Sequence, residues 1–256
     1  RKVEYSPRKD AKNQVVDGFV HDRAPAFATV TPRVIEQLLF PYLDKGRSIL
    51  IQATCGYMLD PVIRVLREMG IPFANLLRPN NGKWNPLPQK RGRGFTIVDR
   101  VLAFSRPRRD FWGEAARFWT PGEVKAWAGA LPATGIFSRG GSAAIHGLSD
   151  EASDRDISDA FSTWFTEEAL RAIVPQPDIT WYLQHVKGSD NLREYVGAVI
   201  GRYGVQKLQE RPLIQLGTVH SVKGGEADIV WVSPDLSLEA SSAAHKDLQA
   251  AEEIRR

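Results

Sequence analysis

The side chains of this sequence that are best suited to chemistry gather in the nine-residue run TVHSVKGGE. Within it, Thr218, His220 and Lys223 carry a hydroxyl, an imidazole and an ammonium group, which can all donate hydrogen bonds. Gly224 and Gly225 follow, and glycine lets the backbone turn tightly and come close to a ligand. This combination suits a partner that carries phosphate groups.

A plainer interpretation of the same run stays open. A loop that leads into a strand also uses glycines for turn geometry alone, and its imidazole and ammonium groups then simply face water. The run from Asp228 to Val232 that follows predicts a buried strand. The nine residues are therefore either a phosphate-facing loop or an ordinary connection ahead of this strand.

Alternating strands and helices are predicted to position the loop. Thr31 and Pro32 suit a helix start, residues 48–53 form a short apolar run typical of a buried parallel strand, and Asp60 opens a second helix that Gly70 can cap. After Gly70, the tripeptide Ile-Pro-Phe leads the chain back toward the sheet. Two more strands are predicted over residues 213–219 and 228–232, and a closing helix over 242–256. A strand, a helix and a returning strand make one unit of a doubly wound sheet.

The spacing T-x-H-x-x-K-G-x-E, followed by a small residue and Asp, resembles the fifth motif of the UvrD/Rep-type superfamily 1 DNA helicases. The strand, helix and Gly-Ile-Pro-aromatic order of residues 48–73 resembles the fourth motif of that family. The resemblance implies an α/β fold, in which a RecA-like parallel sheet is flanked by helices as in P-loop NTPases, but without the P-loop itself. It assigns residues 1–75 and 212–256 to the second RecA-like motor domain, and residues 76–211 to an inserted, mainly helical subdomain.

Helical patterns in residues 76–211 agree with such an insert. Thr120 can cap a helix over 120–130, with a proline in its first turn and Glu123 completing a capping box. Three further helices are predicted, over residues 96–105, 166–174 and 190–203.

The resemblance also implies roles for individual residues. Glu226, with Gly224 and Gly225, is expected to contact the nucleotide. The expected contacts to single-stranded DNA are made by Thr218, His220, Ser221 and Lys223. One position departs from the family, because the fourth motif usually carries an arginine directed at the γ-phosphate where this sequence has Ala53. The loss of that arginine would weaken the stabilisation of charge in the transition state.

Residues 78–109 concentrate positive charge, with nine basic residues against one acid and a net charge of +8. Arg91 and Arg93 in this segment are expected to contact DNA, since cations neutralise phosphates and aromatic rings stack on bases. The alternative is a solvated loop whose aromatic residues belong to the core. The aromatic residues in and beside the segment are Trp84, Phe95, Phe104, Phe111 and Trp112.

Two motifs needed for nucleotide hydrolysis do not occur in the sequence. No G-x-x-x-x-G-K-[ST] P-loop is present, and no predicted strand ends in the Asp-Glu pair that would hold Mg²⁺. We therefore expect no catalytic residue here and no ATP hydrolysis by the chain alone. The expectation is a part of a larger helicase, cut before the sixth motif, whose missing N-terminal RecA-like domain completes a site for ATP and Mg²⁺. The chain would supply one wall of the nucleotide cleft and part of the path of single-stranded or partly duplex DNA.

Two other functions stay open: a non-catalytic module that binds nucleic acid or protein, and a metal-dependent nuclease. The five histidines are dispersed, and no metal site is expected from them. A single cysteine, Cys55, and the lack of an apolar run of about 20 residues favour a reducing cytoplasm and no membrane partner. The nuclease alternative rests on a cluster of carboxylates: Asp150, Glu151, Asp154, Asp156 and Asp159.

Overall fold

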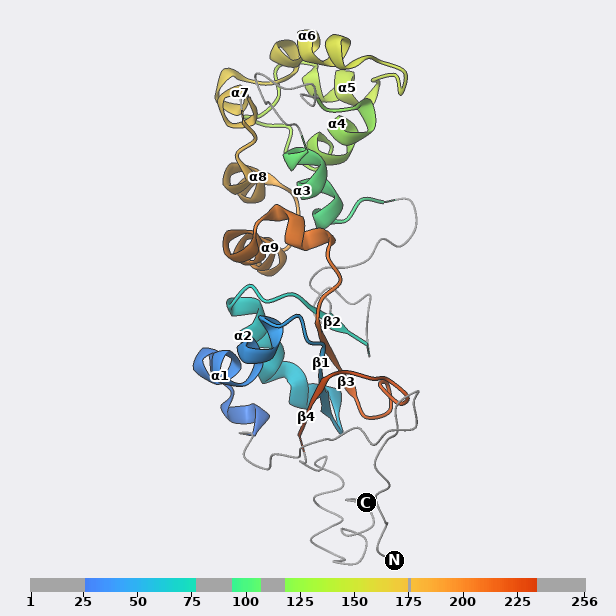
Figure 1. The fold of residues 1–256 in the computed structure, drawn as a ribbon. Coiled ribbons are helices and arrows are strands. Elements are labelled where there is room, and N and C mark those ends of the chain that lie inside the picture. The colour runs from blue at the N-terminus through green and yellow to red at the C-terminus, as the bar shows by residue number, and fades with distance from the viewer. Residues whose placement is uncertain (1–25, 77–93, 107–117, 175, 234–256) are drawn as a thin grey trace, which may run out of the picture.

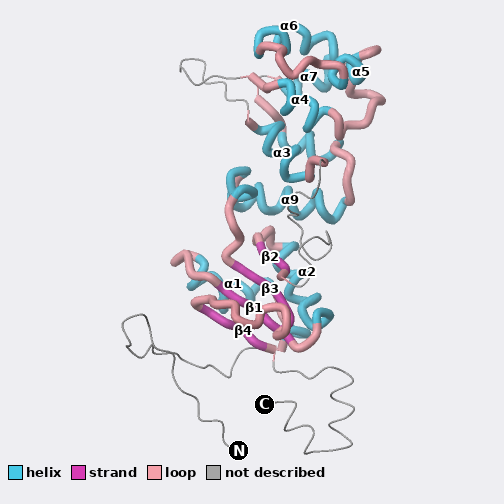
Figure 2. Tube along the Cα trace, turned by 90° about the vertical axis from the view of Figure 1, so that its right-hand side faces the viewer, coloured by secondary structure: helices cyan, strands magenta, loops and turns pink. Residues whose placement is uncertain are grey.

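All four strands of the described chain join one parallel sheet in the order β2-β3-β1-β4 (Figures 1 and 2). The computed structural model describes residues 26–76, 94–106, 118–174 and 176–233. The predicted α/β class with a parallel sheet flanked by helices is confirmed, and the layout is consistent with a RecA-like domain. The strands are β1 (Ile49–Ala53), β2 (Phe73–Asn75), β3 (Ile214–Thr218) and β4 (Ile229–Val232).

The register of the sheet brings the carboxyl ends of the strands to one edge. Ala53 pairs with Thr218, and Gln52 pairs with Val232. On the other side of β3, Asn75 pairs with Leu216. Loops that leave β1, β2 and β3 therefore start side by side, which is where open parallel sheets place their ligands.

The helices α1 (Pro32–Leu43) and α2 (Asp60–Glu68) pack on the sheet (Figure 1). As predicted, Thr31 caps α1, because its hydroxyl accepts a hydrogen bond from the Val34 amide at 3.4 Å. Gly70 ends the α2 unit with a φ of +65°, a conformation that glycine adopts without strain. Both predicted helices are thus confirmed together with their end signals.

The prediction that the strand over 228–232 is buried is wrong for one of its faces. Val230 and Val232 are 49% and 45% exposed, whereas Trp231 between them is buried and packs edge-on against Phe27. The reason is topology, because among the described strands β4 pairs only with β1 and lies at the edge of the sheet.

A helical lobe follows β2 in the chain and lies beyond the sheet in Figure 1. Its predicted helices over 96–105, 120–130 and 166–174 are confirmed with small changes at their ends. Three helices between and after them were not predicted, because they are short or carry many polar residues. The lobe contains α3 (Ile97–Ser105), α4 (Pro121–Ala128), α5 (Gly141–His146), α6 (Asp154–Trp164), α7 (Glu167–Ile173) and α8 (Ile179–His185).

Aromatic rings form the centre of this lobe. Phe104 is fully buried and stacks on Tyr182 with ring centroids 4.4 Å apart. Trp119 stacks on Phe161 at 5.2 Å, and its indole donates a hydrogen bond to the carbonyl of Ala103 at 3.0 Å. Phe104 is therefore a core residue, and the nucleic-acid interpretation of the aromatic residues near the basic segment is wrong for it.

Helix α9 (Asp190–Tyr203) lies between the two lobes in Figure 1 and packs against α2. The buried hydroxyl of Tyr195 donates to the carbonyl of Ile71 at 2.8 Å. The backbones also meet closely, since a Cβ added at Gly70 would lie 2.5 Å from the carbonyl of Ala198. A short 3₁₀ turn, η3 (Val205–Gln209), then leads to β3. These contacts cross the predicted boundary between residues 1–75 and 76–211, which stays a prediction.

In the described ranges, we find no helix with the length and apolar character that crossing a membrane requires. The predicted helix over 242–256 lies outside those ranges.

Candidate functional site

The run TVHSVKGGE forms the first part of the connection between β3 and β4. Its start is fixed to the neighbouring strand, because the amide of Val219 donates to the carbonyl of Ala53 at 3.0 Å. The chain then turns at once, with the amide of Val222 donating to the carbonyl of Thr218 at 3.1 Å. The connection thus leaves the sheet at its carboxyl edge, beside the end of β1.

Two of the predicted DNA contacts have partners inside this turn. Thr218 is buried, and its hydroxyl oxygen accepts from the Ser221 amide at 3.3 Å. The Ser221 hydroxyl donates in return to the Thr218 carbonyl at 3.0 Å. These bonds give both residues a role in shaping the turn, while their contact to DNA stays a prediction.

The backbone geometry of the turn also explains why glycines occur in and next to this run. Gly224 adopts a φ of +80°, and a Cβ added at Gly225 would lie 2.9 Å from the carbonyl oxygen of Val222. Just before the turn, a Cβ at Gly217 would lie 2.4 Å from a methyl carbon of Val222. Turn geometry therefore explains these glycines without a ligand, and their predicted contact to a nucleotide stays untested.

The polar side chains of the loop that face outward are His220, Lys223 and Glu226, which are all exposed. His220 comes two residues after β3, so an imidazole and, three residues later, an ammonium group are available near the carboxyl edge. Glu226 comes later, where the connection approaches the start of β4. The structure thus keeps these three predicted residues on one loop, whereas Arg91 and Arg93 lie outside the described residues.

Asp228 anchors the far end of the loop, a role that was not predicted from the sequence. Its carboxylate accepts hydrogen bonds from the Ser48 hydroxyl at 2.7 Å, the Ser48 amide at 2.8 Å and the Arg47 guanidinium at 3.1 Å. The bonds from Ser48, with the charge of Arg47, hold the pKa of Asp228 below its ordinary value of 3.8. The partners stand 180 residues apart in the sequence, and the only local signal is a polar residue directly before each of two parallel strands.

Ala53 occupies the position where the resembling family carries an arginine. Its side chain is fully buried in the core on the face that receives α1 and α2, whereas Thr54 next to it is exposed. An arginine at position 53 would have to bury its guanidinium in this core. The arrangement at the end of β1 therefore differs from one that presents a cation at that position.

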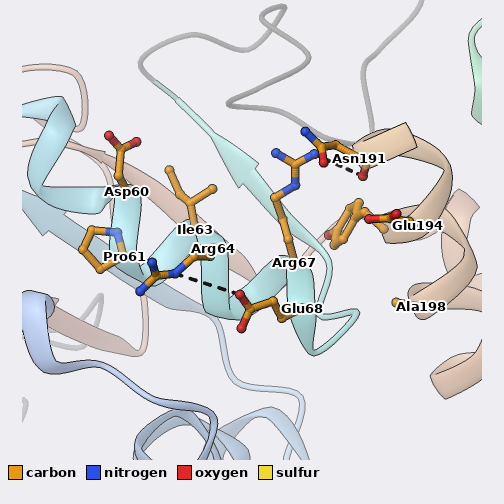
Figure 3. A pocket seen from close by; sticks show the side chains of 10 residues that line it. Asp60, Pro61, Ile63, Arg64, Arg67, Glu68, Asn191, Glu194 and Ala198 are labelled. Carbon is orange, nitrogen blue, oxygen red and sulfur yellow. Dashed lines mark hydrogen bonds and ion pairs between the residues drawn. The ribbon is translucent and has the colours of Figure 1, made fainter. Parts of the chain in front are cut away.

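A separate cleft of about 730 Å³ lies between α2 and α9 (Figure 3). Arg67 reaches across it and donates to the carbonyl of Asn191 at 3.3 Å, while Arg64 pairs with Glu68 at 3.9 Å. Glu194 and Tyr195 line the opposite wall. None of the predicted site residues within the described ranges lines this cleft.

Two of the carboxylates on which the nuclease alternative rests, Asp156 and Asp150, have structural roles that can be named. Asp156 completes a capping box with Ser153 at the start of α6, and Asp150 pairs with Lys125 at 2.7 Å. The side chain of Asp154 lies outside the description. Across the described residues, no group of three or more histidine, cysteine or acidic side chains is placed to hold a metal ion.

The geometry of the carboxyl edge is thus a fixed turn with exposed imidazole and ammonium groups, while the carboxylate of Glu226 lies farther along the connection, near the start of β4. Comparison of the whole chain with family models, curated proteins and solved structures found no match.

Proposed function

We propose that this chain is the second motor domain of an ATP-dependent DNA helicase or translocase and holds single-stranded DNA at the carboxyl edge of its sheet. One observation carries the proposal. The run T-x-H-x-x-K-G-x-E starts at the carboxyl end of β3, beside β1, in an all-parallel sheet. An edge of this kind gathers loops from separate strands, as ligand binding in open α/β sheets requires.

In this proposal His220 and Lys223 contact the DNA backbone, on a turn shaped by Thr218 and Ser221. Glu226 reaches the nucleotide, which lies against a second RecA-like domain that carries the P-loop and the Asp-Glu pair. That domain supplies the groups that hold ATP and Mg²⁺, and the chain alone hydrolyses no ATP. We expect a cytoplasmic protein.

The DNA contact is tested by measuring the affinity for a fluorescent oligo-dT over a series of salt concentrations. Each phosphate contact to a single strand contributes a slope of about −0.7 to the logarithm of the binding constant against that of salt. Lys223→Ala should therefore make the slope shallower by about 0.7 and weaken binding at low salt.

Lys45→Ala is the matched control, since Lys45 is also exposed but precedes β1 at the opposite edge of the sheet. It should leave the slope unchanged. An equal effect of the two substitutions would argue against a contact at the β3–β4 loop.

Buried Ala53 favours a second candidate, a non-catalytic module that binds nucleic acid and has lost nucleotide chemistry. The two functions differ in one result. The motor domain, joined to a RecA-like domain with a P-loop, shows DNA-stimulated ATP hydrolysis that Glu226→Ala reduces. The binding module binds single-stranded DNA with a strong salt dependence, but nucleotide has no effect in either form.

A further inference from the structure

Exposed apolar side chains gather at the same carboxyl edge. Seven large hydrophobic residues are exposed among those that the structure describes, and three of them lie in the connections that leave β1, β2 and β3. Leu76 (39%) and Val219 (43%) are the first residues after β2 and β3, and Tyr57 (49%) lies in the turn that follows β1. Val232 ends β4 at the same edge, and the remaining three are Phe95, Tyr203 and Val230. An apolar patch beside exposed polar donors is a common mark of a binding surface.

The register of the sheet keeps the three loops close together. Val219 is hydrogen-bonded to the end of β1, and the amide of Leu76 donates to the carbonyl of Leu216 in β3 at 2.8 Å. The Cβ of Leu76 also lies 3.6 Å from where a Cβ at Gly217 would be. Neighbouring strands are about 4.8 Å apart, so the loops after three adjacent strands fit within the span of a few nucleotides.

Tyr57 is held on a short, well-anchored turn. It belongs to the 3₁₀ turn η2 (Gly56–Leu59), which follows β1 and is closed by a hydrogen bond from the Met58 amide to the Cys55 carbonyl at 3.2 Å. Leu59, two residues later, is fully buried and fixes the turn to the core. The partly exposed phenol ring is therefore carried by a turn that is fixed to the core of the sheet lobe.

We propose that Tyr57 stacks on a base of the bound single strand, with Val219 and Leu76 providing apolar contacts beside it. This assignment rests on the proposed function and specifies that the carboxyl edge contacts the bases of the DNA as well as its phosphates. The chemistry is complementary, because His220 and Lys223 of the adjoining loop suit phosphates while the aromatic ring suits a base of any identity. The chain also runs from Leu76 directly into the segment 78–109, whose net charge is +8.

The test compares two oligonucleotides with the same backbone, oligo-dT and a version with abasic sugars, binding to the 256-residue chain in a fluorescence anisotropy titration. Stacking by an aromatic side chain predicts that Tyr57→Ala weakens oligo-dT binding about tenfold. Tyr57→Phe keeps the ring and should bind as the original chain does. Tyr203→Ala, which removes an exposed tyrosine on α9, should also have no effect.

The abasic strand gives a readout that does not depend on a variant. The original chain should bind the abasic strand about tenfold more weakly than oligo-dT, and Tyr57→Ala should reduce that difference. Equal binding of both strands by the original chain, or full affinity of a folded Tyr57→Ala protein for oligo-dT, would overturn the stacking role and leave the DNA contact at Lys223 standing. No binding of either strand at low salt would instead refute the proposed function itself.

Discussion

Ala53 ends β1 with its side chain in the core, one residue before the exposed Thr54. This alternation is that of any strand, in which successive side chains point to opposite faces. A cation at position 53 would therefore face α1 and α2, whereas a cation at position 54 would face solvent at the carboxyl edge. An arginine at the end of β1 can therefore contact a phosphate from position 54 but not from position 53.

A pair of substitutions tests this reading of the strand end. Ala53→Arg places an unpaired charge in a packed core and should destabilise the protein by more than about 3 kcal/mol in urea unfolding. Thr54→Arg, one position later, should change the stability by only about 0.5 kcal/mol. If Ala53→Arg is tolerated as well as Thr54→Arg, the end of β1 does not have the described register.

At the scale of elements, a cluster of hydrogen bonds, which we call the clamp, holds the start of β4 to the start of β1. Asp228 accepts three hydrogen bonds from Arg47 and Ser48, and its own amide donates to the Ser48 hydroxyl at 3.0 Å. Because β4 has β1 as its single neighbour in the described part of the sheet, this clamp and the pairing with β1 together fix where the β3–β4 loop ends.

The clamp predicts a dependence on pH. The pKa of Asp228 is lower in the folded state than its ordinary value of 3.8, so the fold favours the ionised carboxylate. Its stabilising contribution is therefore complete above that ordinary value and is lost as the pH falls through the folded pKa. Asp228→Ala should lower the urea midpoint at pH 7, and the difference from the original protein should shrink near pH 3.

Asp44→Ala is the control, because Asp44 is an exposed residue at the end of α1. It should have little effect at either pH. A difference for Asp228→Ala that stays the same at pH 7 and pH 3 would show that the carboxylate charge does not support the clamp.

The elements that the sequence predicted are those whose ends carry a local signal. Thr31 and Thr120 each cap a helix by accepting a hydrogen bond from an amide three residues away, so the whole signal lies within one turn. Short helices such as α5 and α8 have six and seven residues and depend on packing by distant parts of the chain. The exposed face of β4 was missed for a related reason, since an apolar run does not tell whether its strand is central or at an edge.

The parts of the candidate site that were predicted from the sequence are also those with a local signal. The loop TVHSVKGGE was found because its residue types and spacing are contiguous in sequence. The Asp228 clamp and the patch of Tyr57, Leu76 and Val219 were not found, because each joins segments that only the sheet register brings together.

At the scale of the whole molecule, α9 fixes the helical lobe to the sheet lobe. Its contacts include the Tyr195 hydroxyl bonded to Ile71, the close approach at Gly70, and Arg202, which lies 4.7 Å from the centre of the Phe40 ring. Burial raises the pKa of the Tyr195 phenol, which favours the protonated hydroxyl that donates this bond. The helical lobe is therefore placed at a set distance from the carboxyl edge, where the DNA is proposed to lie.

Hydrogen exchange measured with and without saturating oligo-dT locates the bound strand on the whole chain at once. We predict slower amide exchange in peptides that cover residues 54–57 and 219–226, because DNA at the carboxyl edge shields both loops. The peptides of α4 to α7 should exchange at unchanged rates and serve as the internal reference. Slower exchange confined to the helical lobe, or unchanged exchange at both loops of the edge, would contradict the proposed site.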